Sequence, residues 1–124
     1  MNAMTTLRTA AALLTVAALG GIVMGIIRLF QNRNPPSWLA MLHGLLAASG
    51  LTLIFYASLA AGISQLGNIG LALLVLAALG GAALNQNYQW KAVLLPRGLL
   101  IGHALCAVAG FALIVLAACS GSVV

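Results

Sequence analysis

The stretch His43-Gly-Leu-Leu-Ala-Ala-Ser-Gly50 occurs a second time, sixty residues later, as His103-Ala-Leu-Cys-Ala-Val-Ala-Gly110. Both copies follow the pattern His-x-Leu-x-Ala-x-x-Gly, and their histidines are the only two in the chain. Each histidine stands near the start of a long apolar segment. A titratable side chain in such a segment is costly, so it marks a functional site by default. The two histidines are therefore the first candidates for a site.

The similarity between the two halves extends well beyond these stretches. Residues 12–57 and 72–117 are identical at 17 of 46 ungapped positions, against roughly five expected by chance for a composition this rich in Ala, Leu and Gly. The identities include the paired glycines of Ala17-Ala-Leu-Gly-Gly21 and Ala77-Ala-Leu-Gly-Gly81, and Pro36 with Pro96. The sequence therefore predicts an internal repeat, with copies at about 8–61 and about 68–121.

Composition predicts the fold class. The chain has 124 residues, of which 64% are hydrophobic and 4% charged, whereas a soluble domain carries about 25% charged residues. We expect an all-α integral membrane four-helix bundle, forming a single transmembrane domain over residues 1–124, built from two tandem, parallel-oriented helical hairpins. Apolar runs predict spans at about 7–29, 38–61, 69–84 and 96–120, with a tight turn at 62–68 and a surface segment at 92–95.

The basic residues predict how the bundle is oriented. Four lie in or beside the loops at 30–37 and 85–96, and Arg8 alone lies at the other end; the four are Arg28, Arg33, Lys91 and Arg97. Cytoplasmic loops carry the excess of Lys and Arg. We therefore expect a multi-pass protein of a bacterial-type inner (plasma) membrane, with both loops cytoplasmic and both termini external.

Several classes of function are excluded by the residues that the chain lacks. Without Asp or Glu there is no carboxylate pair for acid–base catalysis, no carboxylate metal site and no Ser-His-Asp triad. The basic residues lie at segment ends rather than in a patch, so the partner that we expect is a lipid bilayer and not a nucleic acid.

The parallel repeat predicts that His43 and His103 lie at the same depth and face each other. Two such imidazoles suit axial ligation of one b-type haem. Gly50 and Gly110, with Gly21 and Gly81, are then expected to make room for the macrocycle.

The haem propionates need cationic partners, and the basic residues at the near surface are the candidates: Arg28, Arg33, Lys91 and Arg97. Other interpretations of the histidine pair remain open: a structural hydrogen bond between helices, or ligation of a chlorophyll-type magnesium or another metal. A stripe such as Gly21-x-x-x-Gly25 is also typical of simple helix packing.

In its four apolar spans and its histidine pair the chain resembles the small transmembrane b-type cytochromes, which hold haem between histidines on facing helices of a four-helix bundle. The resemblance implies electron exchange with a quinol or a redox partner protein, by an electron carrier rather than an enzyme. Many of these cytochromes hold two haems with two histidine pairs, and this chain has one pair. The alternative function is a non-catalytic accessory subunit of a larger membrane complex, with or without a chlorophyll-type pigment.

Overall fold

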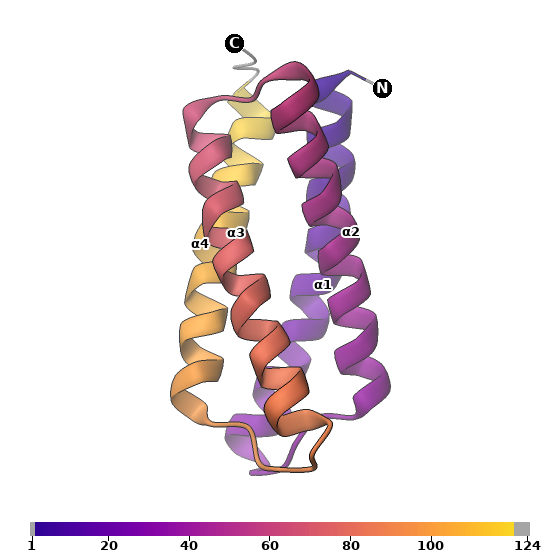
Figure 1. The fold of residues 1–124 in the computed structure, drawn as a ribbon, viewed down its shortest axis with the longest axis vertical. Helices are drawn as coiled ribbons and strands as arrows, with labels where there is room; N and C mark the ends of the chain where they lie inside the picture. Colours follow the sequence, from indigo (N-terminus) through magenta and orange to yellow (C-terminus); the bar gives the residue numbers. More distant parts are fainter. Residues whose placement is uncertain (1, 121–124) are drawn as a thin grey trace.

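The computed structural model describes residues 2–120, which form four long helices (Figure 1). These are α1 (Ala3–Phe30), α2 (Ser37–Ala61), α3 (Gln65–Leu84) and α4 (Arg97–Ser120). Each helix is long and apolar enough to cross a membrane. The expected all-α, four-helix architecture of a multi-pass membrane protein is thus confirmed.

Small polar residues and helix breakers define the helix ends. The side chain of Asn2 caps α1 by accepting a hydrogen bond from the backbone N–H of Thr5 at 2.8 Å. Gly62, whose φ is 68°, ends α2 in a conformation that favours glycine. Ser64 then caps α3 through the N–H of Gly67. Because of this cap α3 begins at Gln65, about four residues earlier than predicted, and the expected turn at 62–68 shortens to 62–64.

The connection from α3 to α4 differs most from the prediction. It begins with a π-helical turn, η1 (Asn85–Gln89), and Ala92 has a φ of 53°. In the segment expected to lie along the surface, residues 92–94 are exposed and Leu95 is buried. Asn34 holds this segment from the other loop: its amide donates to Val93 O at 2.7 Å, and its oxygen accepts from Leu95 N at 3.0 Å.

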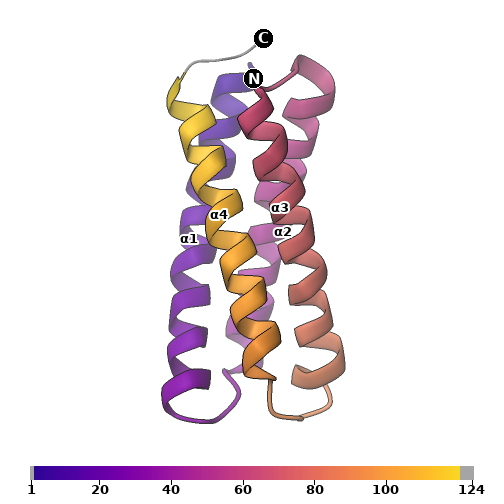
Figure 2. The same cartoon turned by 90° about the vertical axis from the view of Figure 1, so that its left-hand side faces the viewer.

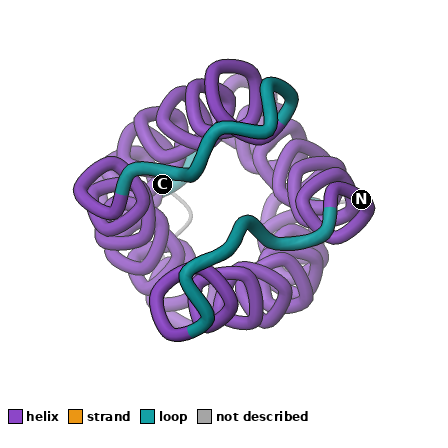
Figure 3. Tube along the Cα trace, turned by 90° about the horizontal axis from the view of Figure 1, so that it is seen from below, coloured by secondary structure: helices purple, strands orange, loops and turns teal. Residues whose placement is uncertain are grey.

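The four helices stand in a ring (Figures 1 and 2). The view from below shows that each of the two loops at that end joins neighbouring helices (Figure 3). The most extensive contacts are α1 with α2 and α3 with α4, and smaller contacts between α1 and α4 and between α2 and α3 close the ring. The helices α2 and α4, which carry the histidines, are therefore diagonal to each other. The loops at 31–36 and 90–96 lie at one end of the bundle, opposite the α2–α3 turn.

The tightly packed core lies in the half of the bundle that is farther from these loops. Its buried residues come from all four helices and the α2–α3 turn: Leu7, Ala10, Leu14, Ile54, Ala57, Ile63, Leu71, Leu74, Ile114 and Ala118. Large apolar side chains such as Leu19, Leu59 and Leu105 are more than half exposed. An exposed apolar surface of this extent fits a surrounding of lipid rather than water.

Gly50 and Gly110 mark the closest approach of the helices within each hairpin. A Cβ added to Gly50 would come 2.8 Å from Leu14 Cγ, and one added to Gly110 would come 2.9 Å from both Leu74 Cγ and Gly70 O. Small residues let membrane helices approach in this way. The helix faces beside these two glycines are thus filled by neighbouring helices.

Candidate functional site: the histidine pair

Each histidine is held by the helix that precedes it in the chain. His43 Nδ1 of α2 lies 2.7 Å from Ala17 O of α1, and His103 Nδ1 of α4 lies 2.7 Å from Ala77 O of α3. A carbonyl oxygen can only accept, so Nδ1 carries the proton and donates in both bonds. In a neutral imidazole the other nitrogen, Nε2, then has a free lone pair, which is the form that binds metals.

Gly21 and Gly81 allow these bonds to form. In a helix the carbonyl of residue 17 points along the axis toward residue 21, so an imidazole that reaches this carbonyl must pass close to residue 21. A Cβ on Gly21 would lie 3.1 Å from His43 Cε1, and one on Gly81 would lie 3.0 Å from His103 Cε1. The two glycines are therefore placed against the imidazoles, whereas a Cβ added to Gly25 would meet nothing within 4 Å.

The two rings face each other across the centre of the helix ring. Their centroids are 6.2 Å apart and their planes are inclined at 74°. Both histidines are half-buried, and neither Nε2 has a hydrogen-bond partner among residues 2–120. Gln89 Oε1 is the one unpaired side-chain N or O atom in that range that is sealed from solvent. Both Nε2 atoms are therefore unpaired and accessible.

The donor set favours a macrocyclic complex over a bare metal ion. No cluster of three or more His, Cys, Asp or Glu side chains occurs within residues 2–120, whereas a structural zinc site uses four protein ligands. A haem supplies four equatorial nitrogens itself and needs two axial ligands. A metal about 2 Å from each ligating nitrogen separates two imidazole centroids by roughly 6 Å, so the observed ring separation fits such a centre.

The other residues predicted for the site lie farther from the rings. Gly50 and Gly110 stand seven residues, or two turns, beyond the histidines and contact Leu14 and Leu74. Arg33 and Arg97 are exposed at the loop end of the bundle. Arg33 is bound to its neighbour Gln31, with its Nε 2.8 Å from Gln31 Oε1.

Arg28 is the residue whose burial the sequence did not indicate. It is 5% exposed, although it belongs to the same basic group as Arg33 and Arg97. One signal was available: Arg28 follows Gly21 by seven residues, which places both on one face of α1. That face includes the glycine that contacts His43.

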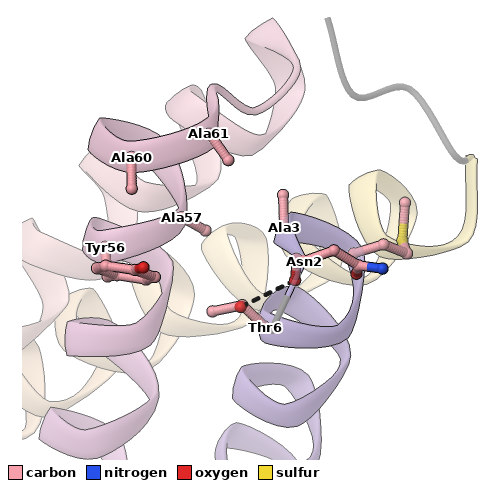
Figure 4. A pocket seen from close by; sticks show the side chains of 8 residues that line it. Asn2, Ala3, Thr6, Tyr56, Ala57, Ala60 and Ala61 are labelled. Carbon is pink, nitrogen blue, oxygen red and sulfur yellow. Dashed lines mark hydrogen bonds between the residues drawn. The ribbon is translucent and has the colours of Figure 1, made fainter.

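Two hollows lie at the ends of the bundle. One, of about 480 Å³, is formed where the start of α1 meets the end of α2; its lining includes Asn2, Thr6, Tyr56 and Ala57 (Figure 4). Tyr56 is exposed and follows His43 by thirteen residues on α2, so this hollow is about 20 Å from the histidines along the helix. The other, of about 520 Å³, is formed by the two loops, and Asn32, Arg33 and Gln89 contribute to its lining.

The histidine site thus consists of two imidazoles on diagonal helices, each oriented by a backbone carbonyl and each with an unpaired Nε2. No protein-family model matches the chain, and no curated protein or solved structure is significantly similar to it.

Proposed function

We propose that the chain is a membrane b-type cytochrome in which His43 and His103 hold one haem b for electron transfer. The observation that carries this proposal is the pair of hydrogen bonds at 2.7 Å from Nδ1 to Ala17 O and Ala77 O. Histidine ligands of metals commonly donate their second ring N–H to a carbonyl or carboxylate, which fixes the tautomer and the ring orientation. Here both candidate ligands do so, at equal distance.

The chain's own residues would hold and orient the haem. His43 and His103 would supply the axial nitrogens, and Gly21 and Gly81 would keep each ring against its carbonyl. Once bound, the haem would supply a one-electron redox centre, and two histidine ligands would leave no open position for oxygen or substrate. The expected role is therefore electron exchange with a quinol or a redox partner protein.

The site lies near one end of the bundle, since each histidine follows the first residue of its helix by six positions. This corresponds to about 9 Å along the helix. With the loops cytoplasmic, as the basic residues predict, electron exchange takes place near the cytoplasmic surface of a plasma membrane.

We also propose that the two hairpins are tandem copies of one unit, related by an axis along the membrane normal. Three contacts recur at an offset of sixty residues and support this: the bonds from the histidines to Ala17 and Ala77, the approach of Gly21 and Gly81 to the rings, and the packing of Gly50 and Gly110 on Leu14 and Leu74. The last position of the second copy, 121, lies outside the described residues.

A second candidate function is an accessory subunit of a larger membrane complex, with the histidines in a structural role. The same two hydrogen bonds favour it, because each ties the two helices of a hairpin together without any ligand. In that case the unpaired Nε2 atoms have no use, which is why we place this function second. If the accessory subunit instead holds a chlorophyll-type pigment, the Nε2 atoms would ligate its magnesium.

The experiment is a titration of the purified full-length chain with haem b, followed by absorption and electron paramagnetic resonance spectra. We expect one haem per chain with a low-spin, bis-histidine spectrum. His43→Ala and His103→Ala should each give a five-coordinate haem or no binding, with similar spectra, because the two ligands are near-equivalent.

Leu45→Ala and Leu105→Ala serve as matched controls, because each lies two residues from a histidine and is exposed on the lipid-facing side. Both should keep the wild-type spectrum. A single histidine variant that retains the bis-histidine spectrum would show that the two residues do not share a metal. A wild-type chain that binds no haem and co-purifies with other subunits would replace the cytochrome by the accessory subunit.

A further inference from the structure

Arg28 is a buried cation in a chain without acidic side chains. It lies in the last turn of α1 and is 5% exposed, and the sequence contains no Asp or Glu to pair with it. Burying an ionised group away from water is unfavourable unless an opposite charge or several hydrogen bonds compensate it. The burial of Arg28 therefore needs a compensating partner.

The protein compensates Arg28 only in part. Its Nε donates to Leu95 O at 2.7 Å, and its Nη1 donates to Asn32 Oδ1 at 3.2 Å. Both acceptors are neutral. A guanidinium has five N–H groups, so three of them have no acceptor among residues 2–120. The acceptors that are present position the guanidinium but do not neutralise it.

Both acceptors come from the two loops, which fixes the guanidinium at the loop end of the bundle. Asn32 has a φ of 50°, a left-handed conformation that asparagine tolerates better than most residues. The left-handed conformation of Asn32 directs its side chain back toward Arg28. Leu95 belongs to the loop before α4 and is 67 positions away in the chain. Arg28 is thus held from two sides.

The nitrogen Nη2 of Arg28 has no hydrogen-bond partner among residues 2–120 and is not completely sealed from solvent. Gln89 Oε1 is the one sealed, unpaired side-chain polar atom in residues 2–120, so Arg28 Nη2, which has no partner either, keeps accessible surface. The remaining basic side chains are all exposed: Arg8, Arg33, Lys91 and Arg97. Among the five basic side chains, Arg28 is the one that is buried, held in a fixed orientation by two hydrogen bonds, and left with unpaired N–H donors among residues 2–120.

We propose that Arg28, positioned by Asn32 and Leu95, binds an oxyanion from outside the chain, either a carboxylate or a phosphate. A planar guanidinium binds both groups with charge-assisted hydrogen bonds. Two molecules can supply the oxyanion. One is a propionate of the haem, and this source rests on the proposed function. The other is the phosphate of an anionic lipid, because Arg28 lies in the last turn of α1 at the loop end of the bundle, where the headgroups of a surrounding bilayer would be; this source does not depend on haem.

The test compares Arg28→Gln, which removes the charge but keeps an N–H donor, with Arg8→Gln, which removes the same charge from an exposed position at the other end of the bundle. Arg28→Lys keeps the charge if the glutamine variant does not fold. In the haem arm, haem b and its dimethyl ester, which lacks free propionates, are titrated into each full-length protein. In the lipid arm, the unfolding temperature is measured in phosphatidylcholine vesicles with and without phosphatidylglycerol.

If the oxyanion is a propionate, wild type and Arg8→Gln bind haem b about tenfold or more tighter than the ester, as expected for a charge-assisted contact. Arg28→Gln then loses this preference. If the oxyanion is a phosphate, phosphatidylglycerol raises the unfolding temperature of wild type and Arg8→Gln but not of Arg28→Gln. Failure of haem binding in the wild type removes the proposed function and leaves the lipid arm intact. The proposal is overturned if wild type shows neither preference, or if Arg28→Gln behaves like Arg8→Gln in both arms.

Discussion

At the scale of single residues, the site depends on a relation between a histidine and a glycine on the neighbouring helix. The spacing from Ala17 to Gly21 and from Ala77 to Gly81 places the accepting carbonyl one helical turn before the glycine. The missing side chain leaves the imidazole a path to that carbonyl. The glycine thereby determines which ring nitrogen carries the proton and which one is free to bind a metal.

We predict that Gly21→Ala and Gly81→Ala weaken haem binding. The added Cβ would lie 3.1 or 3.0 Å from Cε1 of the histidine, so the ring must move by a few tenths of an ångström and its bond to the carbonyl lengthens. Loss of such a supporting bond typically costs about 10–100-fold in metal affinity. The measurement is a haem titration, together with the nitrogen-15 chemical shifts of the imidazoles in the haem-free protein, which report the tautomer.

Gly25→Ala and Gly102→Ala are the controls, because neither added Cβ meets anything within 4 Å. Both should keep the wild-type affinity and, since alanine favours helix over glycine, lose no stability. If Gly21→Ala keeps both the affinity and the imidazole shifts of the wild type, the glycine does not position the ring.

The sequence was informative about which residues form the site but not about their bonds. The repeat predicted that His43 and His103 face each other, and a ring separation of 6.2 Å agrees with that. The carbonyls of Ala17 and Ala77 were not predictable, because every residue has a carbonyl and the choice depends on helix packing. The burial of Arg28 escaped prediction for a similar reason, since its partner Leu95 lies in a distant loop.

At the scale of helices, the two hairpins are held by close approaches at glycine. Gly50 meets mainly the side chain of Leu14, whereas Gly110 meets the backbone oxygen of Gly70 as well as Leu74. A leucine side chain can change its rotamer to make room, but a backbone carbonyl in the middle of a helix cannot. The hairpin of α3 and α4 is therefore the less tolerant of the two.

We predict that Gly110→Ala destabilises the protein more than Gly50→Ala. Overpacking of this kind costs about 1–3 kcal/mol, and the upper part of the range belongs to Gly110. Both variants should lose stability as a whole rather than lose haem selectively. The measurement is reversible unfolding in mixed micelles, with Gly44→Ala, whose added Cβ meets nothing within 4 Å, as the control. Equal stability of all three variants would contradict the packing role.

Helix boundaries were predictable where a strong breaker stands and uncertain elsewhere. The bounds of α2 agree with the prediction to within one residue at its start, because Pro35, Pro36 and Gly62 define it. The early start of α3 depends on Ser64, a weaker signal inside a polar stretch. The π-helical turn η1 was not predicted, since a shift of the backbone hydrogen bonds by one residue has no side-chain pattern of its own.

At the scale of the whole molecule, the two ends of the bundle differ in charge. The loop end carries Arg33, Lys91 and Arg97 on its surface and Arg28 beneath it, while Arg8 is the one basic residue near the other end. The first residue of α1 and the last residue of α4 lie at that other end, next to the α2–α3 turn (Figure 1). The histidines belong to the half of the bundle on the side of the charged loops.

We predict that a reporter fused after Val124 behaves as external to the cytoplasm, because positively charged loops are retained on the cytoplasmic side. A phosphatase that is active outside the cytoplasm should be active in this fusion, and a fluorescent protein that matures in the cytoplasm should be dark. The same reporters inserted in the loop after Arg33 should give the reverse result. Replacing Arg33, Lys91 and Arg97 by Gln while adding three Lys to the α2–α3 turn should move the C-terminal reporter toward the cytoplasm. A C-terminal fusion that is cytoplasmic in the unaltered chain would instead place the loops, Arg28 and the histidine pair near the outer surface, where an electron partner would have to be external.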